Sequence, residues 1–338
     1  MTNRYHMKLH VMKTTPPSWL EERSVAKYVR WKGIKLMDND NVVLKFLKQS
    51  YKSLKFSVDY RGYTVMNASD GNAVIKRIVQ TGNPAMVARC GATEMRCVGE
   101  YLTSGTFSDK IRREIQELSG VFPTTDEVLK KFCEYYMSCT AQADMLALWG
   151  VGAENRVIKT KCRKNTQYCK LEALEPYYFE QPWSEALRGK KVLVVHPFVD
   201  SIQKQYQQRE NLFTNKNILP EFQSLTCVKA VQSIAGEKTE FETWFDALDY
   251  MKTQIKATDF DVAIIGAGAY SLPLAAFVKQ QGKVAIQMSG ATQILFGIKG
   301  KRWESIPEVS KLFNEYWVRP AENEKPKKSE KVEGGSYW

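Results

Sequence analysis

The sequence predicts an α/β fold: a Rossmann-like, mostly parallel β-sheet with flanking helices, preceded by a basic helical N-terminal extension. Short apolar runs rich in β-branched residues alternate with segments of helical length, which is the pattern of a parallel sheet. Several of these runs end in glycine or other small residues, as buried strands often do before a helix. No apolar run reaches the roughly 18 residues that a membrane-spanning helix needs.

The composition, with 43% hydrophobic and 25% charged residues among 338, is typical of a globular protein with ample material for a core. Seven cysteines without paired spacing argue against a disulfide framework. Cys162 and Cys169 are too far apart for the usual zinc pair, and there are only three histidines. Because no secretory signal opens the sequence, we expect a reducing, cytoplasmic location, with peripheral contact at the inner face of the membrane as an option.

The net charge of +12 is unevenly distributed along the chain. Residues 1–62 hold 13 Lys and Arg against 5 Asp and Glu, a net +8. Such a basic extension favours an anionic partner: a membrane surface, a nucleic acid or a phosphorylated acceptor. We do not expect nucleic acid, because the basic residues are not interleaved with aromatic residues on a recognisable module.

The extension, residues 1–58, contains two predicted helices, at 18–29 and 41–55. The second has apolar residues at helical spacing, with lysines mostly on the other side. A basic amphipathic helix of this kind can lie on an anionic membrane. The alternative is that its apolar face packs on its own domain and the lysines are merely solvated. The apolar positions are Val43, Phe46, Leu47, Tyr51 and Leu54, and the basic ones are Lys45, Lys48, Lys52 and Lys55.

The α/β domain is expected at 59–319, with a first half at 59–150. That half should contain helices at 72–80, 95–102, 111–118 and 126–137, a strand at 85–89 and a short helical piece at 144–149. A loop at 90–94 follows the strand, so Arg89 and Glu94 should lie at the mouth of the strand, where polar groups meet ligands. The alternative is that these two side chains form a buried ion pair.

Residues 151–188 are rich in Lys, Asn, Tyr and Pro with weak periodicity, and we expect a link between the two halves. The nucleotide-binding half, 189–319, should alternate strands at 191–195, 226–231, 259–265 and 284–288 with helices at 201–213, 241–255 and 272–281. The charged tail at 320–338 is expected to be mobile or lightly docked.

Two loops of the second half are candidate ligand loops. The turn Gly266–Tyr270 consists mostly of small residues, which let a ligand approach the backbone, and the helix after it would point its N-terminus at a phosphate. The loop at 289–293 follows the next strand, so both loops lie at the carboxyl ends of strands. A dinucleotide fingerprint is the alternative, but Ser271 replaces its third glycine and the next strand ends in Gln287 rather than an acidic residue. A sugar nucleotide or another phosphate-bearing ligand is therefore favoured over NAD. A further alternative is a turn that binds nothing, since many α/β proteins have such a Gly-rich turn without a ligand.

Two motifs resemble the GT-D-type glycosyltransferases of bacterial polysaccharide and glycan assembly. Residues 87–94 read Val-Ala-Arg-Cys-Gly-Ala-Thr-Glu, where the family has roughly Arg-Phe-Gly-Asp-Gly-Glu. Residues 264–270 and 282–290 read Ile-Ile-Gly-Ala-Gly-Ala-Tyr and Gly-Lys-Val-Ala-Ile-Gln-Met-Ser-Gly. The resemblance spans about 65–315. It implies a GT-D-like fold and sugar transfer from a nucleotide sugar, most often a UDP-sugar, to a glycan or lipid-linked acceptor in surface polysaccharide assembly.

The resemblance also implies a metal, Mn²⁺ or Mg²⁺, but with one departure. Arg89, Gly91 and Glu94 match the family's Arg, Gly and Glu, whereas the Asp of its Asp-x-Glu motif falls at Ala92. Glu94 alone is then left as a metal ligand. Three alternatives stay open: Arg, Lys and helix N-termini neutralise the diphosphate, another residue holds the metal, or the chain is a non-catalytic sugar-nucleotide-binding scaffold.

Sugar transfer needs a base for the acceptor hydroxyl and a stabilised leaving diphosphate. The candidate bases are Glu94 and His196, the latter with a purely structural role as the alternative. Lys299, Lys301 or Arg302 could neutralise charge, and Tyr206 or Trp303 could stack on the base or the sugar. The predicted substrate-binding residues are Arg89, Gly91, Gln205, Tyr206, Gly266, Gly268, Tyr270, Gln287, Ser289, Gly290, Gln293 and Arg302.

Overall fold

The computed structural model describes residues 40–327, 329–331 and 334–338. Residues 55–338 form one compact unit, and of the unit before it the structure describes only the beginning of α2 (Asp40–Asp59). This helix confirms the one predicted at 41–55, whereas the helix predicted at 18–29 lies outside the described residues. Within the described chain, no helix is both long and apolar enough to cross a membrane.

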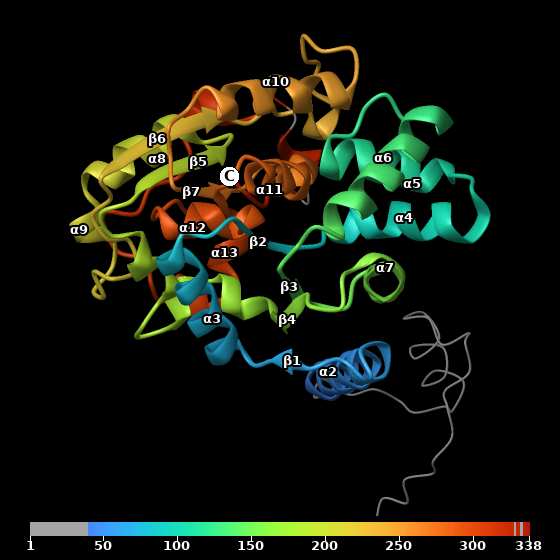
Figure 1. The fold of residues 1–338 in the computed structure, drawn as a ribbon, viewed down its shortest axis with the longest axis horizontal. Helices are drawn as coiled ribbons and strands as arrows, with labels where there is room; N and C mark the ends of the chain where they lie inside the picture. The colour runs from blue at the N-terminus through green and yellow to red at the C-terminus, as the bar shows by residue number, and fades with distance from the viewer. Residues whose placement is uncertain (1–39, 328, 332–333) are drawn as a thin grey trace, which may run out of the picture. The chain divides into compact units, whose positions relative to one another are not determined.

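Eight parallel strands form one sheet in the order β1-β4-β3-β2-β8-β7-β5-β6, which confirms the predicted fold class (Figure 1). The two halves of the chain meet where β2 pairs with β8, with Val87 opposite Ile286. The strands are β1 (Val65–Met66), β2 (Ala85–Arg89), β3 (Met145–Leu148), β4 (Gln167–Lys170), β5 (Lys191–His196), β6 (Ser224–Lys229), β7 (Val262–Ile265) and β8 (Val284–Gln287).

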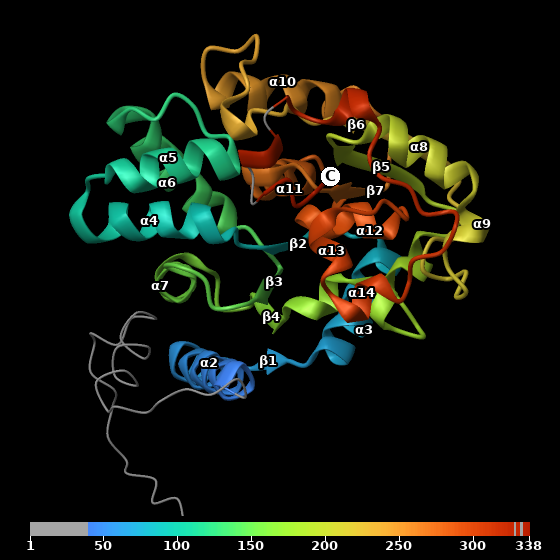
Figure 2. The ribbon, with the colours of Figure 1, turned by 180° about the vertical axis from the view of Figure 1, so that it is seen from behind.

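Helices cover both faces of the sheet. Alternate residues of a strand point to opposite faces, so each buried strand contributes side chains to both core layers. Met86 and Ala88 of β2 face one core layer, and Val87 faces the other. The first layer is built by α4 (Ala92–Ser104), α5 (Asp109–Ser119), α6 (Asp126–Thr140), α7 (Glu154–Lys161), α10 (Trp244–Lys256) and α11 (Ser271–Gln280). The second contains α3 (Ala68–Thr81), α8 (Val199–Gln207), α9 (Arg209–Leu212), α12 (Thr292–Leu295), α13 (Lys301–Glu304) and α14 (Pro307–Ser310) (Figure 2).

Local sequence explains where several helices begin and end. Ser108 and Thr125 accept hydrogen bonds from main-chain N–H groups at the starts of α5 and α6, and Thr243 and Asp246 form a capping box at the start of α10. Gly82 ends α3 with a positive φ of 67°, a conformation that glycine adopts without a steric cost.

The prediction of a helix at 144–149 is wrong, because this stretch contains β3. Met145–Leu148 is buried on both faces and pairs with β2 and β4. A continuous run of four apolar residues has no periodicity that separates a strand from a helix. The expected link at 151–188 is also not a link: it holds α7, β4 and the 3₁₀ turns η1 (Leu171–Leu174), η2 (Pro176–Tyr178) and η3 (Trp183–Leu187).

The described part of the tail is docked rather than mobile or lightly docked. The buried Glu324 carboxylate accepts hydrogen bonds from the main-chain N–H groups of Asp200 and Ser201, at 2.8 and 3.3 Å, at the start of α8. Trp338 is 9% exposed and packs near Phe198. The expectation rested on charge and on Pro, which reveal nothing about these long-range contacts.

Smaller differences concern element boundaries. The loop expected at 289–293 forms the turn η6 (Ser289–Ala291) and the start of α12, and α4 begins at Ala92 rather than at residue 95. The helix expected at 201–213 is divided into α8 and α9, and β6 lies two residues before the predicted strand.

Candidate functional site

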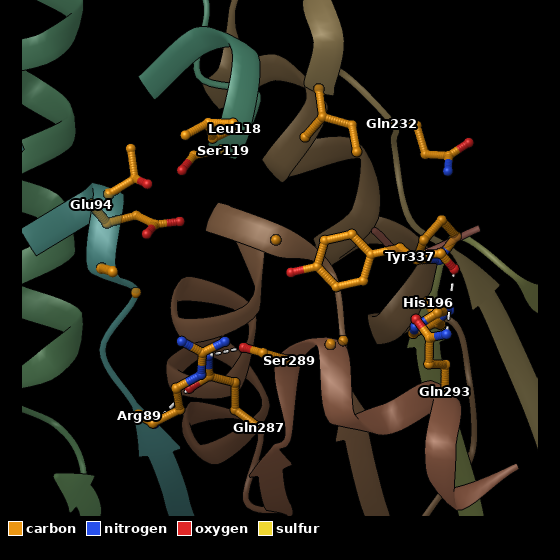
Figure 3. A pocket seen from close by; sticks show the side chains of 18 of the residues that line it. Arg89, Glu94, Leu118, Ser119, His196, Gln232, Gln287, Ser289, Gln293 and Tyr337 are labelled. Atoms are coloured by element: carbon orange, nitrogen blue, oxygen red, sulfur yellow. Dashed lines mark hydrogen bonds between the residues drawn. The ribbon is translucent and has the colours of Figure 1, made fainter. Parts of the chain in front are cut away.

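A pocket with a volume of about 180 Å³ opens where four neighbouring strands end (Figure 3). Arg89 ends β2, Gln287 ends β8, Gly266 follows β7 and His196 ends β5, and all four line the pocket. The site therefore lies at the carboxyl edge of a parallel sheet, at the junction of its two halves, where open α/β sheets bind ligands.

The structure brings together most of the predicted site residues. Eleven of the fourteen line this pocket, from segments up to 213 positions apart in sequence: Arg89, Gly91, Glu94, His196, Gly266, Gly268, Gln287, Ser289, Gly290, Gln293 and Arg302.

The other three do not line it, since their polar groups are engaged elsewhere. The buried Gln205 amide donates to the carbonyls of Gly297 and Tyr316. The Tyr206 hydroxyl accepts from the N–H of Phe222 at 2.6 Å, and its ring stacks on that of Phe222. The Tyr270 hydroxyl bonds to Ser233, and its ring stacks on Trp244. Lys299, Lys301 and Trp303 do not line the pocket either.

Arg89 is held by contacts on both sides. Its main-chain N–H donates to Gln287 Oε1 at 2.7 Å, and its guanidinium lies 5.2 Å from the ring centroid of Trp149 and donates to the carbonyl of Cys90. Trp149 Nε1 donates to the same carbonyl at 2.8 Å, which fixes the ring beneath the guanidinium. No ion pair joins Arg89 to Glu94, both of which the structure describes, so the alternative of a buried pair does not hold.

Glu94 lies in the first turn of α4, and its side chain points into the pocket (Figure 3). Its carboxylate folds over Gly91, where an added Cβ would come within 1.9 Å of Glu94 Oε2. The Tyr136 hydroxyl accepts from the N–H of Gly91, and burial together with the charge of Glu94 raises the pKa of Tyr136 well above its usual value. Tyr136 therefore presents a neutral hydroxyl beside the carboxylate.

His196 is buried and neutral. Its Nδ1 accepts a hydrogen bond from the N–H of Phe198, so the proton of the neutral ring is on Nε2. Burial lowers the pKa of His196 to about 3. This geometry makes His196 a hydrogen-bond donor at neutral pH, which argues against the role of general base.

Gln287 and Ser289 shape the pocket floor. Gln287 accepts from the N–H of Arg89 and donates to the Ser289 hydroxyl at 2.9 Å, so its amide joins the ends of β2 and β8. Ser289 has a φ of 52°, an uncommon conformation for a residue with a side chain, and such strain often marks functional sites. Gly266 has a structural role, since a Cβ there would come within 2.7 Å of His196 Cδ2.

No residue of α11 lines the pocket within the described chain, so the predicted phosphate site at that helix N-terminus is not part of it. Sequence reasoning missed other lining residues. Tyr136 follows the buried stripe of α6 and resembles an ordinary core residue, Trp149 follows the misassigned β3, and nothing local marks the tail. The principal missed residues are Ser119, Tyr136, Trp149, Gln232, Tyr337 and Trp338.

The pocket offers few ligands for a divalent cation. Among the described residues that line it, Glu94 has the only carboxylate side chain, and Ala92, which also lines it, has no side-chain donor atom. Among the residues that the structure describes, no group of three or more His, Cys, Asp or Glu side chains could hold a metal ion. The side chains present thus fit arginine-based charge neutralisation better than a metal held by the protein.

No protein-family model matches this chain, and no curated protein sequence matches it. Solved structures similar to it include one described as "The highly conserved domain of unknown function 1792 has a distinct glycosyltransferase fold", at 14% identity and a TM-score of 0.43, with 70% of this chain and 82% of that chain covered. Another is described as "A New Glycosyltransferase (DUF1792) from Streptococcus sanguinis", at 13% identity and a TM-score of 0.43, with 76% and 100% covered. The first of these two solved structures is described as a glycosyltransferase fold and the second as a glycosyltransferase.

Proposed function

We propose that the protein is a glycosyltransferase that moves a sugar from a nucleotide sugar, with a UDP-sugar as the first candidate, to a glycan or lipid-linked acceptor. One observation carries the proposal: the guanidinium groups of Arg89 and Arg302 and the carboxylate of Glu94 line one pocket at the carboxyl edge of a parallel sheet. Arginine binds phosphate oxygens in a bidentate way, and a carboxylate can accept a proton. The GT-D resemblance of residues 87–94 supports the same reaction class.

In the proposed reaction, the bond between the anomeric carbon and the diphosphate oxygen breaks, and a bond from the acceptor hydroxyl oxygen to that carbon forms. The nucleoside diphosphate leaves with the electron pair, and the acceptor proton goes to the Glu94 carboxylate. Arg89 and Arg302 stabilise the charge that grows on the leaving diphosphate. His196 donates its Nε2–H to an oxygen of the donor.

Charge neutralisation by arginine is the part of the proposal that departs from the family pattern. Since Ala92 stands where the family has a metal-binding Asp, the proposed steps do not pass through a metal. Mn²⁺ or Mg²⁺ brought by the diphosphate could still contact Glu94, and the experiment below includes both ions.

A non-catalytic protein that binds a sugar nucleotide is the second candidate. Ala92 favours it, because this residue removes a donor from the motif that the resemblance identifies. The two candidates share the pocket and differ in turnover alone.

Thermal unfolding with a panel of nucleotides and nucleotide sugars, with and without Mn²⁺ and Mg²⁺, tests the proposal. A ligand that binds the folded state raises the Tm. A Tm rise with one nucleoside diphosphate, followed by release of that diphosphate from its sugar when acceptor is present, is the expected result. Binding without turnover would support the second candidate, and no Tm change with any nucleotide would contradict both.

We also propose that α2 contacts an anionic membrane, where a lipid-linked acceptor would be found. Leu54 and Val58 of this helix are 58% and 48% exposed, and Lys52 and Lys55 are exposed near them. Flotation with phosphatidylglycerol vesicles tests it: a Leu54→Ser, Val58→Ser double variant and a chain without residues 1–58 should both bind less. Unchanged binding of the truncated chain would contradict the membrane contact.

A further inference from the structure

The strap, residues 334–338, lies across the pocket and contributes part of its wall. Tyr337 and Trp338 both line the pocket, and the Tyr337 ring reaches into it between the sides occupied by Glu94 and His196 (Figure 3). Upstream, the tail is anchored by Glu324, which bonds to the start of α8, and the carbonyl of Glu324 accepts from the pocket residue Gln232. The strap is thus held at the site by the fold of the tail.

The strap presents oxygen atoms to hydrogen-bond donors of the pocket wall. The Tyr337 hydroxyl accepts from the Arg302 guanidinium at 2.9 Å, and the Ser336 carbonyl accepts from the Arg302 main-chain N–H at 2.8 Å. The Tyr337 carbonyl accepts from the Gln293 amide at 3.4 Å. A guanidinium, an amide and a main-chain N–H that converge on a row of oxygens are also the donors that would bind a diphosphate.

The volume of the pocket indicates that the strap occupies space that a nucleotide sugar would need. At about 180 Å³ it is smaller than the roughly 300–1,000 Å³ that small-molecule sites usually offer. A nucleotide sugar needs more room than the pocket has while the Tyr337 ring is inside.

Close packing against two glycines seats the strap. A Cβ at Gly290 would come within 2.7 Å of Tyr337 Cε1, and one at Gly300 within 2.7 Å of the Tyr337 carbonyl oxygen. The strap begins at Gly334 and Gly335, whose φ values of 71° and 79° suit a sharp turn. Trp338 Nε1 is buried without a hydrogen-bond partner among the described residues. This lowers the stability of the arrangement in which the strap lies in the pocket.

We propose that the strap occupies the diphosphate part of the donor site as an internal competitor, and that a nucleoside diphosphate displaces it to reach Arg302 and Gln293. The inference rests on the proposed function for the identity of the ligand. Competition of this kind multiplies the intrinsic affinity by the fraction of molecules whose strap is out of the pocket, so the apparent Kd is the intrinsic Kd divided by that fraction. If about one molecule in ten is open, removal of the strap contacts raises the apparent affinity about ten-fold.

Titration calorimetry of the full chain with UDP and with inorganic pyrophosphate tests the proposal. Tyr337→Ala removes the ring. Gly300→Ala adds a Cβ that would come within 2.7 Å of the Tyr337 carbonyl oxygen and 3.0 Å of Gln293 Nε2, so it displaces the strap backbone while the ring stays intact. Both should bind each probe about ten-fold more tightly than the unmodified chain. The matched controls are Tyr316→Ala, at an exposed tyrosine outside the pocket, and Gly99→Ala, where the added Cβ meets nothing closer than 3.7 Å. Both controls should leave binding unchanged.

Hydrogen exchange on the unmodified chain adds a test that needs no variant. Saturating pyrophosphate should speed exchange in residues 334–338 while the Arg302 amide stays protected. Equal or weaker binding by both variants, no binding of either probe, or a strap that exchanges more slowly with pyrophosphate would overturn the proposal. Tighter binding by the variants without sugar transfer would refute the transferase reaction and leave the strap inference standing. Sugar transfer by the chain, with the affinities of both variants unchanged, would support the transferase reaction and refute the strap inference.

Discussion

The Nδ1 atom of His196 accepts a hydrogen bond of 3.0 Å from the main-chain N–H of Phe198. Together with burial, which lowers the pKa of His196 to about 3, this contact keeps the ring neutral. The unfolded chain takes up a proton near the ordinary pKa of 6.5 and the folded chain does not, so folding stability falls as the pH drops from 6.5 towards 3.

His196→Asn should remove this dependence on pH. As the pH is lowered from 6 to 4, His196 should reduce the free energy of unfolding of the unmodified chain by up to roughly 1.4 kcal/mol per pH unit. Urea unfolding of the variant should lack this contribution. In the proposed reaction, sugar transfer by the unmodified chain should likewise show no step near pH 6.5. If NMR shows that the imidazole of His196 titrates with a midpoint near 6.5, burial does not keep this ring neutral and the prediction is wrong.

Glu94→Gln should abolish proton removal and preserve donor binding. The change keeps the size of the side chain and removes the one side-chain carboxylate among the described residues that line the pocket. We expect kcat to fall about 10²–10⁴-fold, with the Tm rise caused by UDP largely kept. Glu100→Gln, on the same helix but outside the pocket, is the control. A variant that keeps full kcat would exclude Glu94 as the base.

Residues around this pocket differ in how far the sequence alone could place them. Strand β2 was predicted with its observed bounds, because Ala85–Arg89 is a short apolar run between a Gly-Asn-Pro turn and a small-residue loop. Glu94 and His196 follow from the general rule that ligands bind at the carboxyl ends of parallel strands.

Other features depend on contacts that local patterns do not encode. β3 is a strand because it pairs with β2 and β4, although its four residues suit either a helix or a strand. Tyr337 reaches the pocket through the anchorage of Glu324 on α8, more than 120 positions away in sequence. Gln205 and Tyr206 lie in α8, the helix that follows β5, but their polar groups bond to neighbouring segments instead of facing the pocket.

Arg89→Lys should weaken nucleotide binding even though the charge is kept. Lysine loses the planar guanidinium that lies 5.2 Å from the centroid of Trp149 and that can grip phosphate in a bidentate way. A loss of about 1–2 kcal/mol corresponds to an affinity for UDP roughly five- to thirty-fold lower. Arg113→Lys, at an exposed position of α5, should leave the affinity unchanged. Equal affinities for Arg89→Lys and the unmodified chain would show that the guanidinium does not contact the ligand.

Glu154 should make stability depend on pH in the direction opposite to His196. Its buried carboxylate accepts from the Tyr60 hydroxyl and from the N–H groups of Trp149 and Gly150, while Oε1 has no partner among the described residues. Burial raises the pKa of Glu154 above 4.5, so the contribution to stability is greatest below pH 4.5 and is lost as the pH rises through the raised value. Glu154→Gln should flatten this part of the urea-unfolding profile, and an unchanged profile would contradict the assignment.

Ala92→Asp should make nucleotide binding dependent on metal. Ala92 and Glu94 both line the pocket, so an added carboxylate would stand beside the existing one and create the pair that a divalent cation needs. We expect the Tm rise with UDP to be insensitive to EDTA in the unmodified chain and to increase with Mn²⁺ in the variant, since the two carboxylates repel one another until a cation joins them. Ala92→Asn is the matched control, because it adds similar volume without the charge and should respond weakly to Mn²⁺. If EDTA removes the Tm rise of the unmodified chain, then Glu94 already works with a metal, and neutralisation by Arg89 and Arg302 alone is refuted.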